Sequence, residues 1–423
     1  MRITQTKEPW IGEIPTEWRL PAIKRLVSSK ITDGPHETPE LADDGVQFIS
    51  AEAIKNNQID FNLRRGFISR ELHEQYSRKC KPQKGDIFVI KSGATTGNVA
   101  CVDVDFEFSI WSPLALIRCD ARIAFYKFVY YVLLTDVFRK QVELSWSFGT
   151  QQNIGMGVIE RLKVPIPSLS EQQRIAAYLD ASCAAIDAAV AAKRRQLETL
   201  DAICNSILLH AITMGLSGLV ETQPTGATVL PEIPTGWRMG RLKSVANIRY
   251  GLGQPPPELA SGVAMIRATD IDAGTIRTDN LLRVDPEVLP PDRNLYLKSG
   301  EIIVVRSGAY TGDSAIVPPT LGEAVAGYDM VVTVTRASSR FIAYCLLSRY
   351  VLEGQLLLLT LRAAQPHLNA EELGSVLLAL PPTLKEQEAI VDFLDTKLAS
   401  VRRIANGIKS QIDTLTAYRK SLI

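Results

Sequence analysis

The amino-acid sequence is written twice along the chain, and this duplication limits the folds that the chain can adopt. EIPTEWR at 13–19 returns as EIPTGWR at 232–238, 219 residues later. GDIFVIKSGATTG, which begins at 85, and PSLSEQQRIAAYLD, which begins at 167, return 215 residues later as GEIIVVRSGAYTG and PTLKEQEAIVDFLD. Because the period is about half of the 423 residues, the repeat predicts two copies of one domain pattern rather than a solenoid.

Each copy begins with a body in which strands and helices are expected to mix. The apolar residues of 86–91 follow a glycine turn and predict a buried strand, which recurs in the second copy. SGATTG at 92–97 predicts a turn, because glycine readily adopts positive φ. A second strand is expected over 98–102, and helix-like apolar spacing appears at 125–138 and 341–352. These patterns predict an α/β fold for both bodies.

Each copy ends in a long amphipathic helix. The first is expected to open with Glu171 and to use Ser170 as its N-cap, which places a carboxylate at the positive end of the helix dipole. Seam residues then recur mostly at alternating steps of three and four, close to a coiled-coil seam. This stripe consists of Ile175, Leu179, Cys183, Ile186, Val190, Lys193, Leu197, Leu200, Cys204, Ile207 and Ala211. The second copy repeats it from Ile390 to Leu422.

The two helices are expected to pair with each other as an antiparallel coiled coil. From Glu171 to His210 the first helix would be about 60 Å long at 1.5 Å per residue, and its apolar stripe needs a partner. Two tandem copies joined in this way would be related by an approximate two-fold axis. The predicted order along the chain is a body over 1–168, a long helix over 169–214, a linker over 215–230, a second body over 231–383 and a second long helix over 384–423.

The sequence lacks the motifs of the common catalytic sites. It contains no GxSxG nucleophile motif and no HExxH zinc motif, and its six cysteines never reach CxxC spacing. The two SGxxTG segments could cradle a phosphate, but neither has the GxxxxGK[ST] pattern, so a structural turn is favoured. Trp18 and Trp237 are expected to be core anchors. The chain is therefore expected to bind rather than to catalyse.

The charge balance excludes a globally basic nucleic-acid coat, because 47 Lys and Arg face 46 Asp and Glu. The stretch 62–84 nevertheless has a net charge of +5, which fits either a solvated loop or a surface that tracks DNA phosphates. The equivalent stretch 277–299 has no net charge. The beginning MRITQTKEPW lacks an apolar signal segment, and no run of 18 apolar residues follows, so a cytoplasmic protein with no membrane partner is expected.

The ordered duplication resembles the specificity subunit of type I restriction-modification enzymes over residues 10–423. The resemblance rests on Pro-Thr-x-Trp, on Gly-Asp/Glu-Ile…Ser-Gly-x-x-Thr-Gly, and on the helix starts Glu171-Gln172 and Glu386-Gln387. It implies two target recognition domains, each of which reads one half of a split, asymmetric site in double-stranded DNA. It also implies a chain that is not itself an enzyme and that docks two modification subunits, together with restriction subunits. S-adenosylmethionine, ATP and Mg are then expected on these partner subunits, and no cofactor on this chain.

Positions at which the two copies differ are the candidates for reading different bases. Segment 28–40 corresponds to 247–259, Lys91 to Arg306, and Thr95 to Tyr310. Arginine can pair with guanine, and His36 or Glu37 could meet a base edge. The candidate DNA-binding residues are His36, Glu37, Arg64, Arg65, Lys91, Thr95, Arg249, Arg267, Arg306 and Tyr310.

Two alternatives come from other functional classes. One is a structural adaptor with two ligand-binding bodies on a coiled-coil strut and no role in DNA binding. The other is an orphan methyltransferase, which the missing catalytic motifs disfavour. Salt-sensitive binding to duplex DNA would separate the reader from the adaptor.

Overall fold

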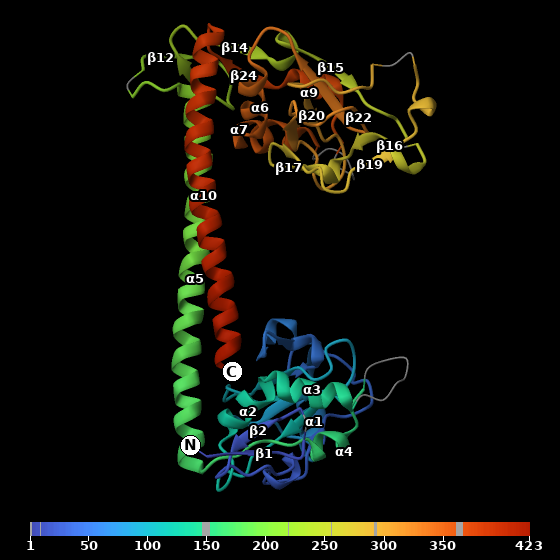
Figure 1. Ribbon diagram of the computed structural model, residues 1–423, viewed down its shortest axis with the longest axis vertical. Helices are drawn as coiled ribbons and strands as arrows, with labels where there is room; N and C mark the ends of the chain where they lie inside the picture. Colours follow the sequence, from blue (N-terminus) through green and yellow to red (C-terminus); the bar gives the residue numbers. More distant parts are fainter. Residues whose placement is uncertain are drawn as a thin grey trace. The chain divides into compact units, whose positions relative to one another are not determined.

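The computed structural model describes residues 2–8, 10–145, 153–218, 220–254, 256–291, 294–360 and 367–423. The chain divides into two compact units. Unit 1 comprises Met1–Ala191 with Ile412–Ile423, and unit 2 comprises Ala192–Gln411. Each unit therefore holds one body together with a segment of both long helices (Figure 1).

Unit 1 is built on a four-stranded antiparallel sheet of order β3-β11-β8-β9 and a three-stranded sheet of order β10-β4-β7. Its strands are β1 (Ile3–Gln5), β2 (Glu13–Pro15), β3 (Thr32–Asp33), β4 (Val46–Ile49), β5 (Ile54–Lys55), β6 (Gln58–Ile59), β7 (Gly66–Ile68), β8 (Ile87–Ile90), β9 (Val99–Cys101), β10 (Phe108–Ile110) and β11 (Leu114–Ile117). Its short helices are α1 (Arg70–Ser77), α2 (Tyr126–Leu134), α3 (Asp136–Leu144) and α4 (Met156–Arg161).

The alternation of side chains along β8 explains how unit 1 is layered. Ile87 and Val89 pack with the apolar faces of α2, α3 and α4. Phe88 and Ile90 point to the opposite face, where they pack with Phe108 of the three-stranded sheet. Because successive strand residues face opposite sides, a strand that is apolar throughout must be covered on both sides. Helices therefore cover one face of the central sheet and the second sheet covers the other.

Unit 2 repeats the two main sheets strand for strand, with orders β15-β23-β20-β21 and β19-β16-β22, and has an additional two-stranded sheet, β14-β24. Its strands are β12 (Thr222–Pro224), β13 (Glu232–Pro234), β14 (Arg238–Arg241), β15 (Ala246–Tyr250), β16 (Glu258–Ile266), β17 (Ile271–Asp272), β18 (Thr275–Ile276), β19 (Leu282–Val284), β20 (Ile302–Val304), β21 (Ser314–Ile316), β22 (Ala324–Ala326), β23 (Met330–Val334) and β24 (Leu377–Leu380). Its short helices are α6 (Ser339–Leu347), α7 (Arg349–Val351), α8 (Leu357–Thr360) and α9 (Ala370–Ser375). The predicted α/β fold and its duplication are confirmed.

Two local predictions need correction, and both concern helix ends. The helical segments expected at 125–138 and 341–352 are each broken, at Thr135 and at Ser348. The Thr135 hydroxyl accepts from the Phe138 amide and so caps a new helix. The first long helix starts earlier than expected, and Ser168 rather than Ser170 accepts from the Glu171 amide at 3.4 Å.

The SGxxTG segments form tight turns in both units. Gly93 and Gly97 have φ of 102° and 90°, and the equivalent Gly308 and Gly312 have 87° and 94°. A threonine hydroxyl closes each turn by donating to the first glycine carbonyl at 2.7 Å. These bonds within the turns support the structural role that the sequence favoured. Of the two predicted anchors, Trp237 is buried and Trp18 packs edge-on against Phe128.

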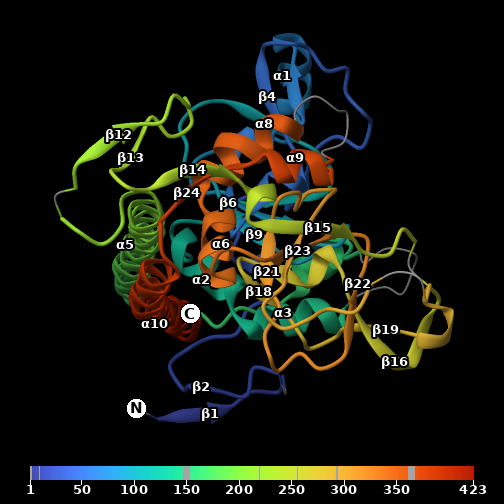
Figure 2. The ribbon, with the colours of Figure 1, turned by 90° about the horizontal axis from the view of Figure 1, so that it is seen from above.

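The long helices are α5 (Leu169–Met214) and α10 (Leu384–Leu422), and they run antiparallel within each unit. In unit 2 Lys193 bonds to the Gln411 amide oxygen, and Leu200 shares a groove with Ile404 and Ile408. In unit 1 Arg419 donates to Asp187 at 2.9 Å. Residue numbers thus rise along α5 as they fall along α10. Figure 2 looks along the two helices and shows them side by side.

Part of α5 is both apolar and largely unburied. One window of 18 residues has a mean hydropathy of 1.5, and only 22% of that window is buried. By length and composition alone this helix could cross a membrane; core helices of soluble proteins pass the same test. The stripe predicted from the sequence is the less exposed side of α5 and α10, so the remaining apolar residues lie outside the helix pairing.

Candidate nucleic-acid interface

In unit 1, three loops meet at the end of the sheet where β8 runs into the SGATTG turn. The loop after β3 contacts the loop after β10, because Trp111 Nε1 donates to the Glu37 carbonyl at 3.0 Å and the Ser112 amide donates to Pro35. The Lys91 amide donates to the Pro113 carbonyl at 2.8 Å and joins the SGATTG turn to the same cluster. These loops bring together His36, Glu37 and Lys91, three of the ten residues predicted to bind DNA, and Thr95 lies in the SGATTG turn that follows Lys91.

A single buried carboxylate, that of Asp33, organises the cations of this cluster. Its oxygens lie 2.5 Å from Lys91 Nζ, 2.6 Å from Lys79 Nζ and 3.2 Å from His36 Nε2. Burial raises the pKa of Asp33, but the hydrogen bonds from Lys79 and Lys91 outweigh burial and leave the pKa below its usual value. The Lys91 side chain is only 13% exposed, so its ammonium has a mainly structural role as the partner of Asp33. The side chains of Lys79 and His36 reach solvent.

The two predicted arginines beside this cluster stack on aromatic rings. The guanidinium of Arg65 lies 4.2 Å from the ring centre of Trp111 and pairs with Glu52 at 3.1 Å. The guanidinium of Arg64 lies 4.6 Å from the ring centre of Phe67 and donates to the Phe61 carbonyl. Stacking fixes the plane of a guanidinium, so both arginines are held in one orientation.

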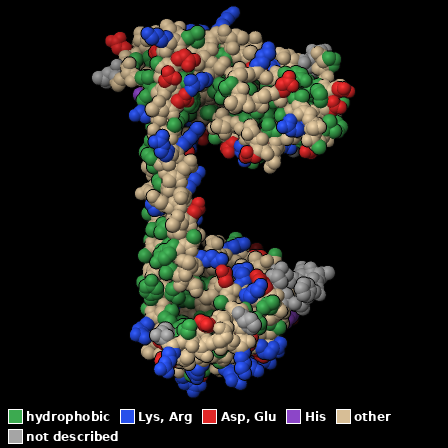
Figure 3. Space-filling view, viewed as in Figure 1, with side chains coloured by type: hydrophobic (Ala, Val, Ile, Leu, Met, Phe, Trp, Pro, Cys, Tyr) green, Lys and Arg blue, Asp and Glu red, His purple; other side chains and the backbone are tan. Residues whose placement is uncertain are grey.

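Lys and Arg side chains gather on the face of unit 1 drawn in Figure 3, but remote carboxylates offset much of the +5 charge of 62–84. Arg70 and Lys81 each lie 2.6 Å from Glu107, and Lys84 lies 2.7 Å from Asp105. The ammonium of Lys81 and the guanidinium of Arg70 lower the pKa of Glu107 to about 2. Asp292 and Arg293, which enter the balance of the second copy, lie outside the described residues.

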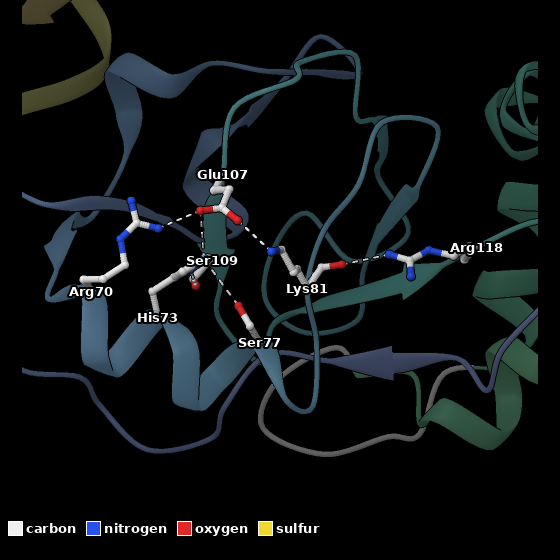
Figure 4. A network of polar contacts seen from close by, with 7 residues as sticks. All are labelled: Arg70, His73, Ser77, Lys81, Glu107, Ser109 and Arg118. Carbon is white, nitrogen blue, oxygen red and sulfur yellow. Dashed lines mark hydrogen bonds and ion pairs between the residues drawn. The ribbon is translucent and has the colours of Figure 1, made fainter.

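Beneath Glu107 lies a histidine–serine pair that could be mistaken for catalytic machinery (Figure 4). His73 Nδ1 lies 2.8 Å from Ser109 Oγ, and His73 Nε2 lies 3.8 Å from Glu107. His73 is 2% exposed and Ser109 is 1% exposed, so no substrate can reach either group. Burial lowers the pKa of His73, which favours the neutral ring. The His73–Ser109 contact is therefore a structural link between α1 and β10.

In unit 2, the predicted arginines differ in how much of their charge is available. Arg249 makes two bonds to the buried Glu301, at 2.6 and 2.7 Å, and further bonds to two backbone carbonyls. Arg267 pairs with Asp270 and closes a short helical turn. Arg306 makes no ion pair with a carboxylate among the described residues, and Tyr310 is exposed at the tip of the SGAYTG turn.

Positions 33 and 91 of unit 1 and positions 250 and 306 of unit 2 form equivalent pairs. Asp33 and Tyr250 end equivalent strands, and Lys91 and Arg306 follow equivalent strands. The two members touch in both units, but as an ion pair in unit 1 and as a cation–π stack at 4.6 Å in unit 2. Equivalent positions of the shared fold are therefore joined by an ion pair in unit 1 and by a cation–π contact in unit 2.

Asp33, Trp111, Tyr250, Tyr328 and His367 were not singled out from the sequence, although the structure places them at the centre of these clusters. Asp33 and Tyr250 lie within the segments 28–40 and 247–259, but the sequence match placed Asp33 opposite Leu252 and Tyr250 opposite Ile31. Only the strand pairing shows that Asp33 and Tyr250 are equivalent. For Trp111, Tyr328 and His367 the sequence offered no comparable sign.

A buried acid adjoins Arg306 in unit 2. Asp329 is 2% exposed, and its Oδ1 accepts from the Arg306 backbone N–H at 3.2 Å. Burial raises the pKa of Asp329 to about 6, against the opposing effect of the Arg306 charge. The folded chain thus retains a proton on this acid where the unfolded chain has released it, and stability falls as the pH rises from about 4 to 6.

We therefore expect Asp329→Asn to stabilise unit 2 above pH 6. Asparagine keeps an oxygen for the Arg306 N–H and removes the cost of burying a charge, which is worth about 1–3 kcal/mol at pH 7.5. The thermal midpoint should rise by about 3–10 °C at pH 7.5 and change little at pH 4. Asp279→Asn, on an exposed residue of the same unit, is the matched control and should leave both midpoints unchanged. An equal shift at both pH values would refute the charge explanation.

A family model described as the type I restriction modification DNA specificity domain matches residues 24–199 and 234–414. The chain is 24% identical over 344 residues to the type I restriction enzyme EcoBI specificity subunit of Escherichia coli, covering 74% of this chain and 70% of that protein. It is 25% identical over 397 residues to the putative type I restriction enzyme MjaX specificity subunit of Methanocaldococcus jannaschii, covering 91% and 87%.

Solved structures share the fold at lower identity. One, from work on complex assembly and conformational transition of the type I R-M system, aligns with a TM-score of 0.72 at 16% identity over 97% of both chains. The HsdS subunit from Thermoanaerobacter tengcongensis aligns with a TM-score of 0.53 at 17% identity, over 97% of this chain and 96% of that one. Both of these matches extend over nearly the whole chain.

Proposed function

The chain belongs to the family of type I restriction modification DNA specificity subunits, and on this premise we propose that its two bodies read the two halves of a split, asymmetric site in double-stranded DNA. One observation carries the proposal: the two units share a topology but carry different polar side chains at equivalent loop positions. A shared fold whose loops carry different side chains is suited to two domains that recognise different base sequences. The ten candidate DNA-binding residues remain part of this proposal, although ion pairs hold the charges of Lys91, Arg249 and Arg267.

We further propose that the long helices dock the partner subunits. Exposed apolar side chains on both helices support this role, because surface patches of this kind mark protein interfaces. They include Tyr178, Ile203, Leu209, Ile404 and Tyr418. Two modification subunits would bind there, and restriction subunits would complete the assembly. Adenine methylation with S-adenosylmethionine, and translocation and cleavage with ATP and Mg, belong to those partners in this proposal.

The test is selection of duplex DNA by the full chain, alone and with candidate modification subunits. A library of randomised duplexes should yield a split motif with a fixed gap, and affinity should fall steeply as salt rises. Binding without any sequence preference, or no binding at low salt, would overturn the proposal. The second outcome would revive the structural adaptor, the alternative that the comparisons do not favour.

A further inference from the structure

Arg306 is held by aromatic rings, and among the described residues no carboxylate forms an ion pair with its guanidinium. The guanidinium carbon lies 4.6 Å from the ring centre of Tyr250 and 4.4 Å from that of Tyr328. Both tyrosines are 43% exposed, so these rings stand at the surface of unit 2. The two contacts fix the guanidinium plane without neutralising its charge.

The nitrogen atoms of Arg306 are not equally accessible. Nε is buried and has no hydrogen-bond partner among the described residues. Nη2 lies 3.0 Å from His367 Nε2, and since a guanidinium only donates, His367 Nε2 accepts there. Nη1 makes no hydrogen bond to the described residues, so its hydrogens remain available to a ligand.

The other predicted cations next to the loops of unit 2 lack this freedom. Glu301 takes two bonds from Arg249, and these bonds and Thr333 lower the pKa of Glu301 despite the opposing effect of burial. Arg267 is tied to Asp270. In unit 1 the equivalent of Arg306 is Lys91, which Asp33 holds in a buried pair. Among the described residues, Arg306 is thus the oriented cation that remains available in this part of unit 2.

We infer that Arg306 reads a guanine in the major groove of the half-site bound by unit 2, and that Tyr250 and Tyr328 position it. This inference rests on the proposed function. Guanine presents two acceptors, O6 and N7, at the spacing of two guanidinium N–H groups, and this pair is the commonest specific contact of arginine with DNA. The stacking of Tyr250 and Tyr328 on Arg306, here called the tyrosine clamp, reduces the side-chain freedom that the arginine would lose on binding DNA. Unit 1 has no arginine that could read guanine at the equivalent position, because that position is occupied by Lys91, whose ammonium pairs with Asp33.

The experiment selects randomised duplexes with the full chain and compares wild type with Arg306→Gln. Wild type should prefer a G·C pair at one position of one half-site by about 10- to 100-fold over other pairs. Arg306→Gln should abolish the preference at that position and leave the rest of the motif, including the other half-site, unchanged. Arg336→Gln removes one exposed positive charge beyond the far end of β23 and should leave every preference unchanged.

Variants of Arg306 and of the tyrosine clamp distinguish a loss of base recognition from a loss of folding. Arg306→Lys keeps the charge but cannot form two parallel bonds, so it should weaken the same position while the chain stays folded. Tyr328→Ala should relax that position, and Tyr328→Phe, which keeps the ring, should restore it.

Each outcome decides between the two proposals. If wild type selects a split motif and Arg306→Gln retains all of its guanine preferences, the inference is wrong while the proposed function stands. If wild type selects no motif, the proposed function itself fails and the inference fails with it.

Discussion

Exchange of the second body should change one half of the recognised site and leave the other half intact. The exchange replaces residues 233–381 with the corresponding body of another specificity subunit. The physical reason is that the apolar clusters of unit 1 and unit 2 have no residue in common. A new body therefore needs to match only the helix residues that pack against it, such as Ile212 of α5 and Ile390 of α10.

The measurement is the methylation pattern in cells that contain the chimera and its partner subunits. The donor body should retain a tryptophan at position 237, because Trp237 Nε1 donates to Glu386 at 2.9 Å and links the body to the start of α10. The matched control is the reciprocal exchange of the first body, which should alter only the other half-site. Loss of both half-sites by a chimera that folds and assembles would show that the bodies are not independent readers.

Lengthening the helix pair should widen the gap between the half-sites. Four residues inserted after Ala192 add about 6 Å, or roughly two base pairs at ~3.4 Å each. Because Asp187 bonds to Arg419 on one side of this point and Lys193 bonds to Gln411 on the other, α10 needs four matching residues after Gln411. Four residues slightly exceed one turn of 3.6, so the stripe stays close to its own face.

The preferred gap should then grow by about two base pairs while both half-site sequences stay unchanged. Methylated sites mapped in cells with the partner subunits give the gap directly. Insertion in α5 alone is the first control and should lower stability, because one of the two helix contacts must break. Paired insertions of two residues turn the stripe by about half a turn and should abolish assembly. An unchanged gap with normal activity would mean that partner contacts, rather than the helices, set the spacing.

The sequence determined the elements whose signal is local or repeated. The buried strand at 86–91, the glycine turn after it and the stripe that runs from Ile390 to Leu422 follow from side-chain periodicity, and all three are present. The duplication added a test, since each element had to occur twice. The helix ends were predicted less accurately. The Ser168 hydroxyl, rather than that of Ser170, caps the start of α5, and the Thr135 hydroxyl caps a new helix within the segment predicted as one helix.

Only the tertiary structure decided which charged groups remain free to bind. Lys91 was a candidate reader in the sequence, but Asp33, 58 residues away, pairs with its ammonium and leaves the side chain only 13% exposed. Arg249 is likewise bound by Glu301, 52 residues away. Arg306 forms no such pair among the described residues; its guanidinium instead stacks on Tyr250, at the end of β15, and on Tyr328. Periodicity is a property of neighbouring residues, whereas the partner of a charge is set by burial and strand pairing between distant segments, which a count of charges along the chain cannot detect.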